Sequence, residues 1–558
     1  MPVLIAAFTV TRPDPLPPPR LEPSFDGTTA SQFARELARR YPDRAPGSPG
    51  ADAATRWVEE QLTAVGLRPV RDEFETSVAG LGREPFVNLI AVAPGRSPDT
   101  IVVVAHRDNA GLAPGASDNA SGTAALLEIA RNVDVSQPVR TLLFLSSDGG
   151  AFGGVGAARF ALQPEILRRH VGPGAALVAV VSLDALASGE PPRLAFGGDS
   201  ARSPAGTLVA TADRAVAVET ERPVGVPSAL AQIVDLAFPF TLHEHGPFVA
   251  RGTPAVTLTT GGERPAEPEA DTLAVLDDEQ LARLGRAAQS LVLSLDERAE
   301  LARTTESYVY AGERTVRGWA IQLLLLAALV PFLVTTVDLF ARCRRRRVAL
   351  GPALRSYATR LGVWAWIAVL VALWSFVGLL PSGEPRPVSP DSGAAGDWAV
   401  AALVALGLVA ALGWLAMRPR LAPAEPATRR EELGGHLAAM LVLGTVALVV
   451  GATNPYALVF LLPSLHAWLW LPHVPRRILP LRVALFALGL AGPALVVGSF
   501  AVRFGLGWDA PWYLLALVSV GYVAPPFLVA GLVWAAAAAQ IGALAVNRYA
   551  PYPGRLER

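Results

Sequence analysis

From Gly318 to the C-terminus, the sequence is a series of long apolar stretches separated by short polar or proline-rich breaks. A helix needs about 20 apolar residues to cross a hydrocarbon core about 30 Å thick, and several stretches reach that length. We therefore predict an all-α transmembrane bundle of about seven helices over residues 318–558, the last broken by Pro525 and Pro526. The predicted spans are Gly318–Phe340, Leu361–Pro381, Trp398–Met417, Leu437–Ala452, Tyr456–Pro472, Val483–Val502 and Trp512–Val546.

The arginines of this region are distributed unevenly between its loops. The segments after the first, third, fifth and seventh spans contain 7, 4, 3 and 3 arginines, whereas the opposite loops contain only Arg386 and Arg503. Because arginine accumulates on the cytoplasmic side, we expect a cytoplasmic C-terminus and an extracytoplasmic part over residues 28–317. The run Arg344–Arg347 is interpreted as a topology anchor and not as a nucleic-acid site. The lysine-free, alanine-rich composition suggests a bacterial chain, hence a multi-pass plasma-membrane protein in contact with the lipid bilayer.

The zero net charge is the sum of two unlike parts. Residues 1–317 contain 29 arginines and 39 acidic residues, a balance of −10, and the remainder has 19 against 9, a balance of +10. The single cysteine, Cys343, excludes an internal disulfide framework and a cysteine-based zinc cluster. Residues 1–27 are an apolar stub and a proline-rich linker, and Val3–Val10 is too short for a span. We expect this stub to be the tail of a span that begins upstream, and we expect residues 301–317 to be a second linker.

Residues 28–300 alternate strand-like and helix-like patterns. Apolar runs predict strands at Val87–Val92, Ile101–Ala105, Thr141–Leu145, Leu177–Leu183 and Ala255–Leu258. Helical periodicity predicts helices at Phe33–Arg40, Ala53–Val65, Ser121–Asn132, Val155–Leu162 and Asp278–Leu295. Strands that alternate with helices indicate an α/β domain with a mostly parallel central sheet. Sites in such sheets form at the carboxyl ends of the strands.

Ligand-type residues follow these apolar runs. His106 and Asp108 come after one strand, Asp118 lies in the loop before the helix predicted to open at Ser121, and Asp184 follows another strand. A further segment reads His243-Glu244-His245-Gly246-Pro247-Phe248 and precedes the strand at Ala255. Neutral imidazoles and carboxylates that converge at one sheet edge suit zinc, and a shared carboxylate can bridge two ions. Each residue alone is also compatible with a turn, a helix cap or a solvated loop.

The order and wording of these segments resemble the M28 family of metallopeptidases, which includes zinc aminopeptidases and glutaminyl cyclases. The resemblance covers roughly Ser31–Leu295 and rests on Arg44–Gly50, the His-x-Asp motif at His106, the Gly-Ala-x-Asp-Asn-x-Ser-Gly motif at Gly115 and the His-x-Pro-Phe motif at His245. It implies an M28-type zinc peptidase sandwich that holds one or two zinc ions. By this resemblance, His106, Asp118 and Asp184 would bind one zinc. Asp118 would bridge to a second ion held partly by His245, and Asp108 would steady His106.

One departure from the family limits this expectation. The family has an adjacent Glu pair after the strand that corresponds to Thr141–Leu145, and its first member is the general base. Here Gly150 and Ala151 occupy those positions. Three alternatives follow: the site is degenerate, Asp148 acts as a shorter-armed base, or Glu244 or His243 rebuilds the second metal position.

Two main hypotheses remain, and they differ in whether the site is catalytic. The first is a membrane-anchored, outward-facing metallopeptidase, an aminopeptidase-type hydrolase that removes N-terminal residues from peptides. The second is a non-catalytic ectodomain that binds a peptide or a metal on a membrane scaffold. A transporter with an accessory capture domain has less support, because the spans lack paired interior charges and a clear inverted repeat.

Overall fold

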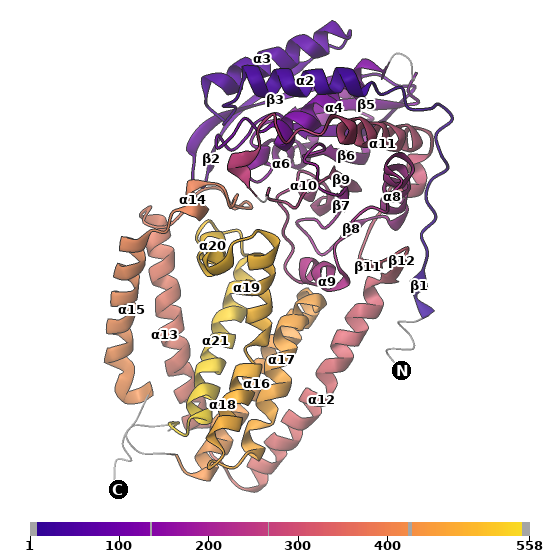
Figure 1. The fold of residues 1–558 in the computed structure, drawn as a ribbon. Helices are drawn as coiled ribbons and strands as arrows, with labels where there is room; N and C mark the ends of the chain where they lie inside the picture. The colour runs from indigo at the N-terminus through magenta and orange to yellow at the C-terminus, as the bar shows by residue number, and fades with distance from the viewer. Residues whose placement is uncertain (1–7, 134–136, 266, 422–426, 550–558) are drawn as a thin grey trace.

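The computed structural model, which describes residues 8–133, 137–265, 267–421 and 427–549, places an α/β domain at one end of a helical region (Figure 1). The domain is built on a seven-stranded sheet with the order β2-β3-β5-β4-β6-β9-β7. Its strands are β2 (Val70–Val78), β3 (Gly82–Ala93), β4 (Ser97–His106), β5 (Arg140–Ser147), β6 (Ala176–Leu183), β7 (Arg193–Ala195) and β9 (Ala255–Thr259).

All five predicted strands are present, and the sheet is mixed. The central pairs β5–β4, β4–β6 and β6–β9 are parallel, whereas β2–β3, β3–β5 and β7–β9 are antiparallel. The parallel arrangement that the sequence predicts therefore holds at the centre of the sheet only. A short turn joins β2 to β3, and such a connection pairs strands in the antiparallel direction.

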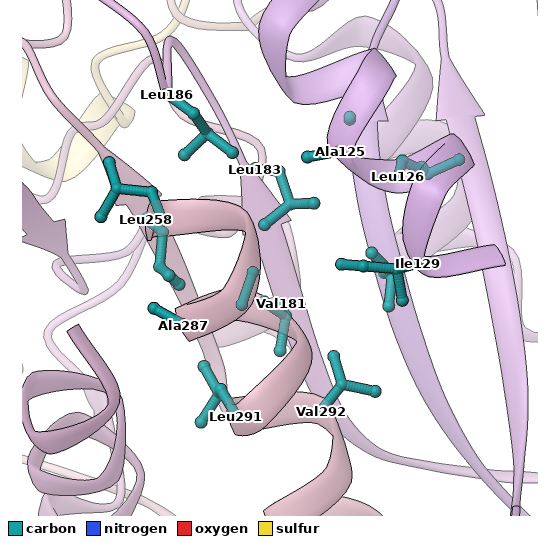
Figure 2. Close-up of a cluster of buried hydrophobic side chains, with 14 of the residues drawn as sticks. Ala125, Leu126, Ile129, Val181, Leu183, Leu186, Leu258, Ala287, Leu291 and Val292 are labelled. Atoms are coloured by element: carbon teal, nitrogen blue, oxygen red, sulfur yellow. The ribbon is translucent and has the colours of Figure 1, made fainter. Parts of the chain in front are cut away.

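Both faces of the sheet are buried, as expected for strands with continuous apolar runs. Along β4, Ile101 and Val103 face one core and Val102 and Val104 face another. The first core lies under α2 (Gly27–Arg40), α3 (Pro49–Ala64), α4 (Gly122–Arg131), α8 (Gly206–Thr220) and α11 (Asp278–Arg298), and the second lies under α6 (Val155–Leu162), α7 (Pro164–Val171) and α10 (Gly246–Ala250). Figure 2 shows side chains of α4 and α11 packed onto β6 and β9. Each fully buried Leu, Ile or Val contributes about 1.5–3 kcal/mol, so these two cores hold the strand ends in place.

A small second sheet connects the α/β domain to the helical region. β1 (Val10–Thr11) pairs with β12 (Arg314–Arg317), which also pairs with β11 (Tyr308–Ala311). A third strand of this segment, β10 (Thr305–Glu306), pairs with β8 (Ser203–Pro204). Most of the predicted linker 301–317 therefore forms short strands. Of the N-terminal stub, residues 1–7 lie outside the described part of the chain, and its last residue, Val10, belongs to β1.

Several helices of the region after β12 are compatible with membrane insertion. Five are long and apolar enough to cross a membrane, and the pair α18–α19, bent by 52°, would make a sixth. The predicted break before Pro525 is confirmed, because α20 ends at Ser519 and α21 begins at Pro525. The helices are α12 (Gly318–Arg345), α13 (Gly351–Phe376), α15 (Val400–Leu421), α16 (Arg429–Thr453), α17 (Leu458–Leu469), α18 (Leu479–Leu488), α19 (Ala491–Arg503), α20 (Ala510–Ser519) and α21 (Pro525–Ala545).

The α/β domain is docked on these helices through specific polar and aromatic contacts. Asn454, after α16, donates to the backbone carbonyl of Leu236 at 2.9 Å, near the end of α9 (Ala229–Ala237). Arg503, at the end of α19, donates to Asp235 at 2.6 Å and forms a second ion pair with Glu263. The Phe240 ring contacts four aromatic rings of the helical region, those of Phe500, Phe504, Tyr513 and Tyr522. The helical region and the α/β domain therefore share an interface.

Candidate metal centre

The parallel strands bring the predicted ligands to one edge of the sheet. His106 is the last residue of β4, and Asp184 follows the last residue of the neighbouring strand β6. Asp118 lies in the loop before α4, and the carboxylate of Asp271 fixes this loop by accepting hydrogen bonds from the amides of Ser117 and Asp118, both at 2.8 Å. Three separate segments thus meet above the carboxyl ends of β4 and β6.

His106, Asp118 and Asp184 form a group whose ligand atoms all lie within 4.8 Å of one another. The Nε2 atom of His106 lies 3.2 Å from Asp118 Oδ1 and 3.5 Å from Asp184 Oδ1. Burial lowers the pKa of His106, but the carboxylates of Asp108, Asp118 and Asp184 outweigh it and hold the pKa well above its ordinary value. The buried Asp184 Oδ1 makes no hydrogen bond within the described residues. One nitrogen and two oxygens that converge in this way are a suitable donor set for zinc.

Asp108 lies behind the imidazole of His106 and touches the loop after β5. Its Oδ1 is 3.4 Å from His106 Nδ1, and its two oxygens accept hydrogen bonds from the amides of Gly150 at 2.8 Å and Ala151 at 3.1 Å. A carboxylate in this position orients the ring of a metal-binding histidine. The backbone at Gly150 and Ala151 therefore helps to position His106 indirectly, through Asp108.

The Gly150 backbone packs against the His106 ring, and no side chain fits there. A Cβ atom on Gly150 would lie 2.1 Å from His106 Cγ, a separation that real Cβ atoms essentially never show. A glutamate at this position is therefore incompatible with the observed position of His106. Any side chain at this position requires the His106 ring or the loop after β5 to move.

This packing predicts the effect of a single methyl group at Gly150. Gly150→Ala is expected to displace the His106 ring and to lower zinc affinity by about 10- to 100-fold, the range seen when the support of a metal ligand is removed. The measurement is a calorimetric titration of the purified full chain with zinc. Gly261→Ala is the matched control, because a Cβ atom there meets nothing within 4 Å. Equal zinc affinity in both variants would contradict the packing argument.

His106, Asp118 and Asp184 line a cavity, and Glu244 is a buried carboxylate that lines it too. Its Oε1 accepts a hydrogen bond from the Ser147 hydroxyl, and its Oε2 has no partner among the described residues. Burial raises the pKa of Glu244 to about 7, although the nearby His106 opposes the shift. Of the two carboxylates that the sequence suggests as substitutes for the Glu pair, Glu244 is the one at the cavity.

Asp148 has a different environment. It does not line the cavity, and its carboxylate pairs with Arg107 at 3.2 Å and accepts from the amide of Val87 at 2.9 Å. Burial raises the pKa of Asp148 to about 6 despite the adjacent Arg107 guanidinium. The structure therefore does not bring Asp148 to the position of a base, because its short side chain is held on the β3 side of the loop.

His243, and not His245, reaches the metal-type residues. His243 Nδ1 lies 2.7 Å from Asp184 Oδ2. The ring of His245 is turned away, with Nδ1 2.8 Å from the Thr257 hydroxyl and Nε2 2.6 Å from the carbonyl of Gly197. Both nitrogens of His245 are thus engaged outside the cavity, so the structure does not bring this predicted ligand to the site.

The cavity has a volume of about 60 Å³ and includes residues that the sequence analysis did not identify. Asp271 and Glu263 lie in a proline-rich loop with no adjacent apolar run to mark them. Ser389, Pro390 and Asp391 come from the segment between α13 and α15, far away in the sequence. The cavity residues that can be found from the sequence are those that follow apolar runs, His106 and Asp184, and those in the motifs around Asp118 and His245.

A family model and several known proteins match parts of the chain. Residues 88–292 match the model of peptidase family M28. The chain is 36% identical over 99 residues to leucine aminopeptidase 1 of Trichophyton equinum, covering 16% of this chain and 26% of that protein. It is 44% identical over 102 residues to transferrin receptor protein 2 of Rattus norvegicus, covering 17% of this chain and 12% of that protein. The chain thus spans about a quarter or less of the length of these curated relatives.

Solved structures resemble the α/β domain at low sequence identity. A zinc aminopeptidase of Bacillus subtilis is 12% identical with a TM-score of 0.41, covering 51% of this chain and 99% of that one. A glutaminyl cyclase of Porphyromonas gingivalis is 18% identical with a TM-score of 0.40, covering 49% and 98%.

Proposed function

We propose that the chain is a membrane-embedded metallopeptidase of family M28, whose family model matches residues 88–292, and that it removes N-terminal residues from peptides. The observation that carries this proposal is the convergence of His106, Asp118 and Asp184 within 4.8 Å at one edge of the sheet, on a cavity. The unpartnered Asp184 Oδ1 supports a metal there, because a buried carboxylate oxygen otherwise finds a hydrogen bond.

A zinc ion held by these three residues would act as a Lewis acid toward the scissile carbonyl and would activate a water. The protein's own residues prepare the ligands for this role. Asp108 orients His106 from behind, His243 holds Asp184 through a hydrogen bond of 2.7 Å, and Asp271 fixes the amide of Asp118. We propose a single ion, since both nitrogens of His245 are engaged elsewhere.

Glu244 is our candidate for the general base that the family supplies from its Glu pair. Its carboxylate faces the cavity, and Oε2 is free of hydrogen bonds from the described residues. In the proposed reaction, Glu244 accepts the proton of the attacking water and returns it to the leaving amine. The Ser147 hydroxyl, which donates to Oε1, holds the carboxylate in this orientation.

A non-catalytic binding domain is the second candidate, and one observation favours it. Gly150 and Ala151 supply no carboxylate, and Gly150 is too close to His106 to carry one. One of the matched relatives, transferrin receptor protein 2, is a receptor by name. In this alternative, the domain binds a metal or a peptide without cleaving it.

We also propose the orientation of the protein in its membrane. The α/β domain lies on the side of the helices where the loops contain only Arg386 and Arg503, and the arginine-rich segments lie at the other end. This distribution supports an extracytoplasmic α/β domain and a cytoplasmic C-terminus at a plasma membrane.

Removal of the metal tests the peptidase proposal directly. The purified full chain in detergent is expected to hydrolyse alanine p-nitroanilide or to act on an N-terminal glutaminyl peptide. The activity should be lost in the presence of a chelator and restored by zinc. Stoichiometric zinc binding without turnover of either substrate would reject the peptidase and favour the binding domain.

A further inference from the structure

One side of the candidate site is built by the helical region. The segment between α13 and α15 reaches up to the α/β domain (Figure 1), and Ser389, Pro390 and Asp391 line the same cavity as His106 and Asp184. We call residues 389–391 the helical-region wall. A domain that needed the helices only as an anchor would complete its cavity without them.

The helical-region wall is fixed to the helices and to the loop around Arg264. The Tyr513 hydroxyl of α20 donates to the carbonyl of Val388 at 2.5 Å, and the Ser392 hydroxyl donates to that of Ser389 at 2.7 Å. Arg264 of the α/β domain pairs with Asp391 at 2.7 Å and donates to the carbonyl of Phe504 at 2.9 Å. The ion pair between Arg264 and Asp391 thus connects the wall to the loop that contributes Glu263 and Pro265 to the cavity.

The segment leading into the wall is also held by the α/β domain. The amide of Glu384 donates to the carbonyl of Ser77 at 2.9 Å, and Arg386 donates to the carbonyl of Val155 at 3.0 Å. Gly153 has a left-handed backbone, and a Cβ atom there would lie 2.3 Å from the carbonyl oxygen of Pro387. Such a close approach between two backbones leaves no space for the wall to move toward the loop after β5.

The resulting cavity is small and acidic. Its volume of about 60 Å³ has room for about four to six water molecules. Six carboxylates line it, those of Asp118, Asp184, Glu244, Glu263, Asp271 and Asp391. Glu263 and Asp391 are paired with Arg503 and Arg264, so the other four carboxylates favour a cationic group inside. Pro390 limits the space in the same cavity.

We propose that the helical-region wall determines the specificity of the site and restricts the substrate to a chain end with a small terminal side chain and a protonated amine. This inference rests on the proposed function and names its substrate class. Pro390 sets the size limit, and Asp391 is held beside it by the ion pair with Arg264. Because the wall belongs to the helical region, substrate choice depends on a part of the chain outside the M28 domain.

The test uses the zinc-loaded full chain and two probes, alaninamide and phenylalaninamide, with binding measured by calorimetry. Wild-type protein is expected to prefer alaninamide. Pro390→Gly is expected to raise the relative affinity for phenylalaninamide at least about 10-fold, the range that hydrophobic pockets achieve for small size differences. Pro390→Leu should lower the relative affinity for phenylalaninamide and should also weaken the binding of alaninamide.

Pro385→Gly is the matched control, because Pro385 lies in the same segment but does not line the cavity. It should leave the ratio of the two affinities unchanged. An unchanged ratio in both Pro390 variants, or no preference in the wild type, would overturn the specificity role of the wall. If the affinities follow the expected pattern but alanine p-nitroanilide is not hydrolysed, the peptidase proposal is rejected and the specificity role of the helical-region wall is retained. Failure of the peptidase proposal is therefore distinguishable from failure of the specificity proposal.

Discussion

Asp184→Asn is expected to lower zinc affinity by more than about 100-fold and to abolish hydrolysis. Among the described residues, Asp184 supplies one of the three converging ligand-type side chains. The loss of a direct ligand exceeds the 10- to 100-fold cost of losing a ligand's support. The substitution also removes the negative charge of the carboxylate that lies close to His243 and His106. Zinc bound per chain, measured by mass spectrometry after dialysis, is the primary readout.

Asp148→Asn is the matched control for this experiment. It changes another buried aspartate that follows a strand of the same sheet, but one that pairs with Arg107 away from the cavity. We expect its zinc content to equal that of the wild type, with a lower melting temperature because Arg107 loses its charged partner. If Asp148→Asn lost zinc and Asp184→Asn retained it, the assignment of the metal centre would be wrong.

Glu244→Gln is expected to reduce kcat by about 10²- to 10⁴-fold, the usual contribution of a general base. The amide keeps the shape of the side chain and can still accept from Ser147, but it cannot take a proton from water. Zinc content is expected to be unchanged, because Glu244 is not among the three converging ligands. The measurement is the initial rate of alanine p-nitroanilide hydrolysis at saturating substrate.

The control for this variant is Glu269→Gln, at an exposed position in the proline-rich loop. It should retain wild-type kcat. A Glu244→Gln protein that has lost zinc would show that Glu244 is a ligand, as the sequence first suggested, and a protein with full activity would exclude it as the base.

The sequence predicts the central strands and the first ligands because both depend on local patterns. Continuous apolar runs identify β4 and β6, and parallel pairing brings the residues that follow them, His106 and Asp184, to one edge of the sheet. The antiparallel edge strand β2 was not predicted, because its sequence has apolar residues only at Val70, Phe74 and Val78, among four charged residues. Neither a continuous apolar run nor a two-residue alternation marks it as a strand.

Three features of the site depend on contacts that the sequence pattern does not contain. His243 and His245 are two residues apart, so the pattern cannot determine which ring turns inward, and the hydrogen bonds of Thr257 and Gly197 decide it. The incompatibility of Gly150 with a side chain becomes visible only beside His106. Asp391 is more than a hundred residues away from every other residue of the cavity outside its own segment.

The two arginines that depart from the charge asymmetry of the loops have a consequence for how the chain is assembled. Arg386 is bound to the carbonyl of Val155, and Arg503 to Asp235 and Glu263, all in the α/β domain. Arg386 also pairs with Glu384 of its own segment at 2.8 Å, whereas Arg503 has both of its carboxylate partners in the α/β domain. The Arg503 guanidinium therefore gains these two carboxylates only when the α/β domain is docked on the helices.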